Sequence, residues 1–107
     1  MAIYILLMQD DDVWQTFSDE EKQGWIGKIR NFAMMIEERV VQADPVKPIG
    51  RFLSGDSVEV VDYTGDAVAP SGYFIFQAED WDDAVGFAKL CPSLEFGGRL
   101  QLREIGH

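Results

Sequence analysis

Apolar residues form short runs along the chain, separated by polar turns, and five of these runs predict strands. Residues 2–8 are aliphatic without a charged residue, typical of a strand whose two faces are both covered. Residues 57–63 alternate and are rich in valine, and the extended segment at residues 49–53 is predicted to pair with them as a hairpin. Residues 72–78 carry three aromatic side chains, and residues 99–105 alternate between aliphatic and polar.

Helical spacing of apolar residues predicts two amphipathic helices between these strands. Ser18 and Glu21 match a capping box, in which each side chain satisfies a backbone amide of the other residue. The first helix therefore begins there, and apolar residues three and four positions apart carry it to Val40. The second helix begins after Asp80 as its cap and ends before Pro92, which cannot continue a helix.

The order β-α-β-β-β-α-β indicates an α+β fold. If one middle strand is the arm of an inserted hairpin, the order is that of a ferredoxin-like split βαβ domain, with an antiparallel sheet and two helices on one face. The other face of the sheet then lacks cover, and a second copy of the chain is the simplest way to supply it. We therefore predict a homodimer through the open sheet face, forming a dimeric α/β barrel, with Phe74 and Phe76 as candidates for the shared surface.

Composition and charge bound the remaining possibilities. The 107 residues, 47% of them apolar, fit a single domain spanning residues 1–107. Nine basic residues against nineteen acidic ones give a net charge of −10, which argues against nucleic acid and anionic membrane surfaces as partners. The longest apolar run is too short to span a bilayer, no basic segment precedes it, and the single Cys91 cannot form an internal disulfide. We expect a cytoplasmic protein.

Short motifs along the chain resemble a known family. The second half contains Gly72-Tyr73-Phe74-Ile75, Glu79-Asp80, Ala84, Ala88, Cys91-Pro92, Phe96-Gly97-Gly98 and Leu102-Arg103. The first half adds an aliphatic strand, an aspartate loop, Trp14, and Ser18 before Glu20-Glu21. Together these resemble the YCII-related family, also called DGPF-domain proteins, over nearly the whole chain. The resemblance implies a dimeric α+β barrel with a ligand cleft between helix and sheet.

The chain departs from that family where its named signatures are expected. Residues 64–71 stand where the Asp-Gly-Pro-Phe run of one branch should fall, and that run is absent. The other branch carries a histidine paired with an aspartate in its pocket, but the one histidine here is the terminal His107. The family's candidate catalytic residues therefore do not transfer to this sequence.

An acidic trio, Asp10, Asp11 and Asp12, follows the first predicted strand, at a position where ferredoxin-like barrels open into a pocket. Asp10 or Asp11 could act as a general base, although adjacent loop carboxylates more often cap a helix or form a turn. The run lacks the spaced ligands and downstream glutamate of a calcium loop, so no metal site is predicted.

Aromatic residues supply the second group of candidates. Trp14, Phe17, Trp25 and Tyr73 could line a pocket around a flat ligand, with Ser71 and Arg30 adding polar contacts. Ordinary core packing explains most of these aromatic residues, because aromatic residues at helical or strand spacing usually belong to the core. The chain contains no G-x-G-x-x-G pattern, and neither a nucleotide site nor any other cofactor is predicted.

Three functions stay open from the sequence. The first is a homodimer that binds a small organic or aromatic ligand in a cleft between helix and sheet. The second is a cofactor-independent enzyme, a lyase or dehydrochlorinase acting on a phenolic substrate with Asp10 or Asp11 as base. The third is a protein-interaction module without a pocket, which would be favoured if Trp14 and Trp25 packed with no cavity between them and the sheet.

Overall fold

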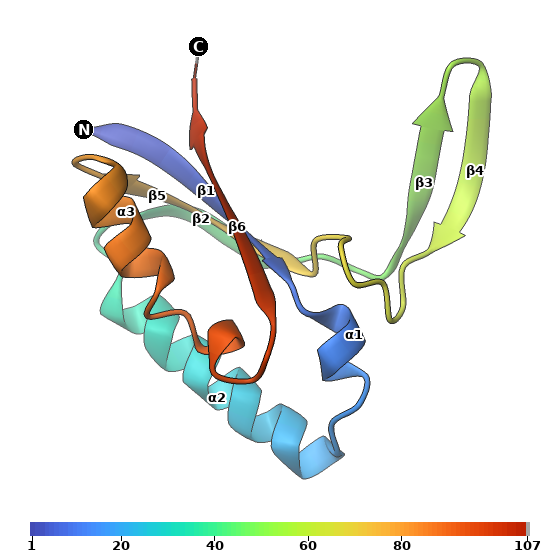
Figure 1. The fold of residues 1–107 in the computed structure, drawn as a ribbon, viewed down its shortest axis with the longest axis horizontal. Coiled ribbons are helices and arrows are strands. Elements are labelled where there is room, and N and C mark those ends of the chain that lie inside the picture. Colours follow the sequence, from blue (N-terminus) through green and yellow to red (C-terminus); the bar gives the residue numbers. More distant parts are fainter. Residues whose placement is uncertain (107) are drawn as a thin grey trace.

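The computed structural model describes residues 1–106, and His107 lies outside the described residues. Figure 1 shows a sheet backed by helices and a hairpin that stands apart from it. In chain order the elements are β1 (Ala2–Gln9), α1 (Asp11–Trp14), α2 (Asp19–Met35), β2 (Val40–Pro45), β3 (Ile49–Ser54), β4 (Ser57–Asp62), β5 (Gly72–Ala78), α3 (Trp81–Ala88), the 3₁₀ turn η1 (Pro92–Leu94) and β6 (Arg99–Ile105).

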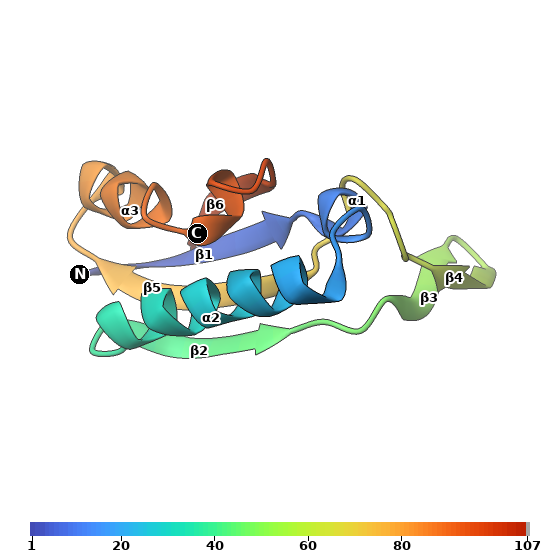
Figure 2. The same ribbon diagram turned by 90° about the horizontal axis from the view of Figure 1, so that it is seen from below.

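The main sheet has four strands in the order β2-β5-β1-β6, and all of its neighbouring pairs are antiparallel. Helices α2 and α3 lie on one face of this sheet, as Figures 1 and 2 show from two directions. This topology confirms the predicted ferredoxin-like α+β fold, with β1 in the centre between β5 and β6. None of the helices within residues 1–106 has the length and apolar character needed to cross a membrane.

The helix starts follow from their caps. The Ser18 side chain accepts a hydrogen bond from the Glu21 backbone N–H, and the Glu21 carboxylate accepts one from the Ser18 backbone N–H, which confirms the capping box. Asp80 accepts a hydrogen bond from the Asp83 backbone N–H at the start of α3, as predicted. Both caps satisfy amides that the first helical turn leaves unpaired.

The prediction that the first helix reaches Val40 is wrong. Helix α2 ends at Met35, and after a short turn Val40 opens β2, which pairs with β5. Val40 still packs against the core, so its apolar character fits a strand facing the helices as well as it fits a helical stripe. Pro45 closes β2, and β2 is an edge strand, where the missing N–H of proline leaves no broken ladder bond inside the sheet.

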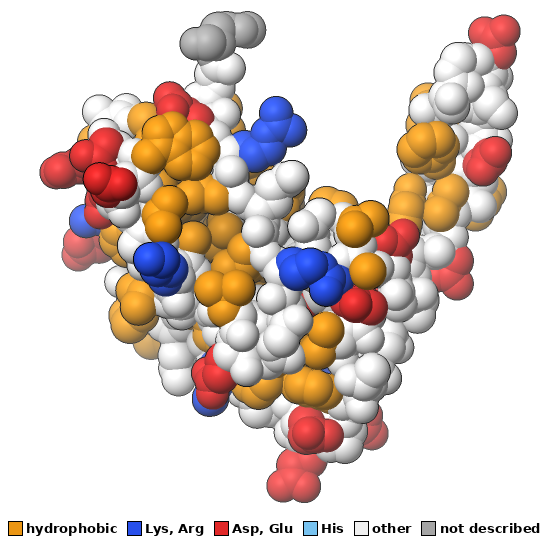
Figure 3. Space-filling model, viewed as in Figure 1, with side chains coloured by type: hydrophobic (Ala, Val, Ile, Leu, Met, Phe, Trp, Pro, Cys, Tyr) orange, Lys and Arg blue, Asp and Glu red, His pale blue; other side chains and the backbone are white. Residues whose placement is uncertain are grey.

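Strands β3 and β4 form the predicted hairpin, but both arms stand outside the main sheet as a separate two-stranded sheet. Figure 3 shows this hairpin projecting away from the body of the domain. Its turn contains Gly55 at φ +57°, a conformation that favours glycine. The edge place that one arm was expected to take in the main sheet is occupied by β2.

The core lies between the sheet and the helices, and it includes the two phenylalanines expected at a dimer surface. Phe74 is 3% exposed and packs edge-on against Phe32 of α2, while Phe76 is 1% exposed and contacts Phe87 of α3. Because side chains alternate along β5, these residues face the helices, and that prediction is wrong. The opposite side of the sheet, called the open face below, carries Ile3, Ile5, Leu7, Tyr73, Ile75 and Ile105.

Candidate functional site

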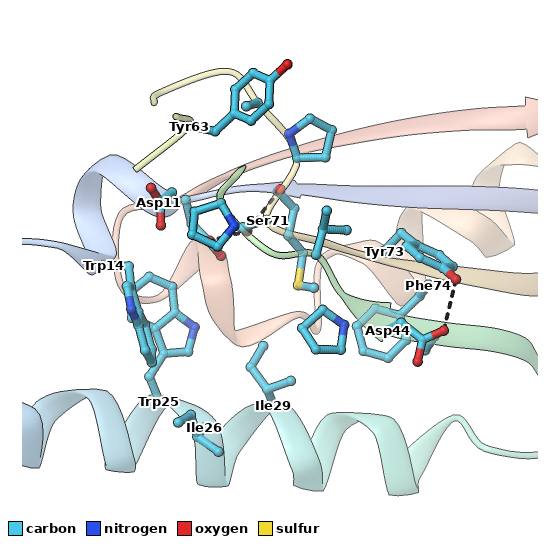
Figure 4. Close-up of a pocket in the computed structure, with 18 of the residues that line it drawn as sticks. Asp11, Trp14, Trp25, Ile26, Ile29, Asp44, Tyr63, Ser71, Tyr73 and Phe74 are labelled. Atoms are coloured by element: carbon cyan, nitrogen blue, oxygen red, sulfur yellow. Dashed lines mark hydrogen bonds between the residues drawn. The ribbon is translucent and has the colours of Figure 1, made fainter. Parts of the chain in front are cut away.

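A cavity of about 650 Å³ lies between α2 and the ends of β1 and β5 nearest to α1. The loop at residues 63–71 contributes to its wall, together with β2 and the segment that follows it. Figure 4 shows its lining side chains converging from these elements. The lining includes Asp10, Asp11, Trp14, Trp25, Arg30, Ser71 and Tyr73, but not Asp12 or Phe17, which the sequence also singled out. Their part in binding a ligand stays a prediction.

The tryptophans form one aromatic wall. The Trp14 and Trp25 rings meet nearly edge-on with centroids 5.4 Å apart, and Trp25 also stacks on Phe96 at 4.7 Å. Trp25 is 2% exposed, so it is both a core residue and part of the cavity lining. At this position, core packing and pocket lining are therefore compatible roles. Trp81, the third tryptophan, lies on α3 and contacts Tyr4, away from the cavity lining.

Asp10 is held by two hydroxyl groups. Its carboxylate, 7% exposed as a residue, accepts a hydrogen bond from Ser71 Oγ at 2.6 Å on one oxygen and from Ser93 Oγ at 2.8 Å on the other. These bonds connect the residue that follows β1 to the residue that precedes β5 and to η1. Gly98 fits closely beside them, because a Cβ at that position would lie 2.7 Å from Asp10 Cβ and 2.9 Å from the Ser93 carbonyl oxygen. This geometry favours a structural role for Asp10.

The other two aspartates of the trio point to different partners. Asp11 accepts hydrogen bonds from the Gly65 backbone N–H and, at 3.3 Å, from the Gln15 side chain. Asp12 forms a 2.7 Å ion pair with Arg99, whose Nη2 also donates to the Ala67 carbonyl oxygen at 2.5 Å. Asp11 and Asp12 thus hold the loop at residues 63–71, which contributes to the cavity wall, against the start of α1. Within residues 1–106 no group of three histidine, cysteine or acidic side chains could hold a metal ion.

Tyr73 belongs to a polar group at the far end of the cavity from the tryptophans, as Figure 4 shows. Its hydroxyl donates to Asp44 Oδ2 at 2.9 Å and accepts from the Gln42 side-chain amide at 2.9 Å. The hydrogen bond to Asp44 is the largest cause of a rise in the pKa of Tyr73 above its ordinary value near 10. Tyr73 is therefore a protonated hydrogen-bond donor at neutral pH and is not available as a base.

Sequence reasoning missed two lining residues that bear on the chemistry. Asp44 lies on β2, a strand that the sequence did not predict. Tyr63 follows β4 and contributes to the cavity wall, and in Figure 4 its hydroxyl points away from the other lining side chains. A tyrosine just before the turn Thr64-Gly65-Asp66 was a signal that could have been used, because strand ends often supply binding residues.

The charges around the cavity are unequal. Three lining residues carry carboxylates, Asp10, Asp11 and Asp44, whereas Arg30 is the one lining residue with a positive charge. Arg30 is exposed at the rim on α2 and forms no salt bridge with the residues that the structure describes. The remaining wall is mainly apolar, from Met8, Ile26, Ile29 and their neighbours. The cavity is thus an apolar, aromatic chamber with an acidic border.

Comparison with known proteins yields a structural likeness without a sequence relative. No family model matches the chain, and no curated protein matches it. Among solved structures, the chain is similar to 5-chloro-2-hydroxyhydroquinone dehydrochlorinase from Burkholderia phenoliruptrix in complex with 2,5-dihydroxybenzoquinone, with a TM-score of 0.62 and 15% identity. The alignment covers 100% of this chain and 95% of that one. At this level of identity the likeness supports the fold alone.

Proposed function

We propose that this protein is a distant relative of the YCII-related proteins that binds a small, flat, uncharged organic molecule of the phenol or quinone type in its cavity. The observation that carries the proposal is the cavity itself, an aromatic and apolar chamber of about 650 Å³ with a few polar groups at its ends. Ligand sites of this size and composition are typical for small organic molecules. The proposal includes the homodimer through the open face that the sequence led us to expect.

The preference for a flat ring follows from the walls. Trp14 and Trp25 offer ring surfaces on the side of α1 and α2, and the Tyr73 hydroxyl and Asp44 stand at the opposite end. A phenolic ligand could stack on the aromatic wall. The solved structure with the similar fold holds a dihydroxybenzoquinone, which is a ligand of the same shape.

The preference for an uncharged ligand follows from the charged residues that line the cavity. Three carboxylates against one guanidinium disfavour an anion, and the net charge of −10 adds to that effect. A neutral hydroquinone should therefore bind more tightly than 2,5-dihydroxybenzoate, which differs from it by one carboxylate. We expect a difference of about 10-fold, equivalent to ~1.4 kcal/mol.

Fluorine NMR of protein labelled with 5-fluorotryptophan tests this proposal directly. The chain has three tryptophans, two in the cavity wall and Trp81 outside it, so the third resonance is an internal control. Saturable shifts of the Trp14 and Trp25 resonances on adding hydroquinone, with Trp81 unchanged, are expected. Equal shifts of all three resonances, or tighter binding of 2,5-dihydroxybenzoate, would contradict the assignment.

A second candidate function is dehydrochlorination of a chlorinated phenol without a cofactor. The dehydrochlorinase with the similar fold supports it, and Asp11, half-buried in the cavity wall, is the better placed base because both oxygens of Asp10 accept serine hydroxyls. Release of chloride from 5-chloro-2-hydroxyhydroquinone is the assay. If release occurs and Asp11→Asn leaves it unchanged, the assignment of the base fails. A protein-interaction module without a pocket would be favoured by the absence of a cavity beside Trp14 and Trp25, and a cavity lies there.

A further inference from the structure

The indole N–H of Trp25 is a polar group that the protein leaves without a partner. Within residues 1–106, every buried side-chain nitrogen or oxygen that is sealed from solvent takes part in a hydrogen bond. Trp25 Nε1 donates no hydrogen bond to any of these residues, so it is not sealed, and free space reaches it. Trp25 is only 2% exposed and lines the cavity, which makes the cavity the space into which its N–H opens.

Aromatic neighbours already cover most of the Trp25 ring. Phe96 stacks on the indole, with ring planes 20° apart and centroids 4.7 Å apart. Phe17 and Trp14 meet it at 55° and 67°, with centroids 5.2 and 5.4 Å away, and Figure 4 shows Trp14 beside it at one end of the cavity. Trp25 therefore has little ring surface left for a ligand to stack on. Trp14 is half-buried, so stacking falls to Trp14 and a hydrogen bond falls to Trp25.

Trp25 differs in this respect from other hydrogen-bond donors of the cavity wall. The Ser71 hydroxyl and the Gln15 amide each donate to an aspartate of the protein. Arg30 and Trp14 also have N–H groups without a partner among residues 1–106, but Arg30 is exposed and Trp14 is half-buried, so water can satisfy them. A donor on a side chain as buried as Trp25 costs free energy unless something in the cavity accepts from it.

We propose that Trp25 is a specificity-determining residue of the cavity, whose N–H donates a hydrogen bond to an oxygen on the ring of the ligand. The inference rests on the proposed function, and it narrows the ligand class to flat rings that carry a hydroxyl or carbonyl oxygen at the aromatic wall. Both groups offer a lone pair to an N–H donor. A ring of the same shape without that oxygen excludes water from the N–H and offers no acceptor in return, so the cavity discriminates against it.

Three ligands of nearly one shape separate the effect of the oxygen from that of the ring. Hydroquinone carries two hydroxyl groups, 4-methylphenol carries one, and 1,4-dimethylbenzene carries none. The variant Trp25→3-benzothienylalanine, made by site-specific incorporation, replaces the indole N–H by sulfur and keeps the fused rings. By titration calorimetry we expect its affinity for hydroquinone and for 4-methylphenol to fall about 10-fold, since one hydrogen bond is lost. Its affinity for 1,4-dimethylbenzene should change by less than about 2-fold, because that ligand accepts no hydrogen bond.

Trp81→3-benzothienylalanine is the matched control, because Trp81 lies on α3 outside the cavity and is 47% exposed. This variant should bind all three ligands as the parent does. A Trp25 variant that binds hydroquinone as tightly as the parent overturns the inference. An equal loss of affinity for hydroquinone and for 1,4-dimethylbenzene also overturns it, because such a loss reports packing of the ring and not a hydrogen bond.

The unaltered chain offers a measurement that needs no variant. In the complex with hydroquinone, the indole N–H proton of Trp25 should show nuclear Overhauser contacts to the ring protons of the ligand, because a hydrogen bond to a hydroxyl oxygen places the adjacent ring protons beside it. The Trp81 N–H should show none. Saturable binding of hydroquinone without these contacts overturns the role of Trp25 and leaves the proposed function intact. Failure of all three ligands to bind saturably refutes the proposed function instead, and this inference falls with it.

Discussion

Replacement of Asp10 by alanine should destabilise the protein substantially, whatever the protein binds. The carboxylate is buried and accepts hydrogen bonds from Ser71 and Ser93, at 2.6 and 2.8 Å. A hydrogen bond to a charged group contributes about 1.5–3 kcal/mol, so losing both costs roughly 3 kcal/mol after the relief of a buried charge is allowed for. Ser93 is fully buried, and its hydroxyl would lose its partner as well.

A double-mutant cycle in urea separates this bond from general disruption. Ser93→Ala should lower the free energy of unfolding by about 1.5 kcal/mol in the parent and by nearly zero in the Asp10→Ala background, giving a coupling energy of about 1.5 kcal/mol. Asp10→Asn, which keeps the shape and one acceptor oxygen, should cost less than Asp10→Ala. A loss below about 0.5 kcal/mol for Asp10→Ala would refute the structural role and return Asp10 to the candidate bases.

Three further predictions follow from local geometry. Gly98→Ala should lower the free energy of unfolding by about 2 kcal/mol because its Cβ would crowd Asp10 and Ser93, whereas Gly27→Ala in open helix surface should raise it by about 0.5 kcal/mol, both by urea titration. Hydrogen bonds from the Glu79 backbone N–H and then from Arg39 lower the pKa of Asp83. The ionised Asp83 therefore stabilises the fold fully above its ordinary pKa near 4, and this stabilisation is lost as the pH falls through the lower pKa of the folded state. In Asp83→Asn the free energy of unfolding should depend less steeply on pH below about pH 4. Burial raises the pKa of Cys91, so a disulfide reagent should modify it only after unfolding, and rapid modification of native protein would contradict this.

The strands that face the core were predictable because burial forces their pattern. The bounds expected for β5 and β6, residues 72–78 and 99–105, are those observed. β5 puts Phe74, Phe76 and Ala78 toward the helices, and β6 puts Leu100 and Leu102 there. This two-residue spacing is the one that a strand satisfies. The capping box of Ser18 and Glu21 was equally readable, because it is a local hydrogen-bond exchange that needs no distant partner.

The edge strand β2 could not be read in the same way. It is paired on one side only, and its six residues include Gln42, Asp44 and Pro45, which are polar or unfavourable in strands. Val40 fits the spacing of the preceding helix, and nothing local opposes that continuation. The position of β2 is decided by β5, whose free edge needs hydrogen-bond partners, and a pairing of that kind is invisible from the segment itself.

The site was predicted in its composition but not in its connections. Trp14, Trp25 and Ser71 were proposed as aromatic and polar contacts for a flat ligand, and all three line the cavity. The three adjacent aspartates show the limit. One sequence motif gives Asp10 to two buried serines, Asp11 to the Gly65 amide and Asp12 to Arg99. These partners are distant in the chain, so a run of carboxylates that suggests shared chemistry instead anchors the separate segments around the cavity.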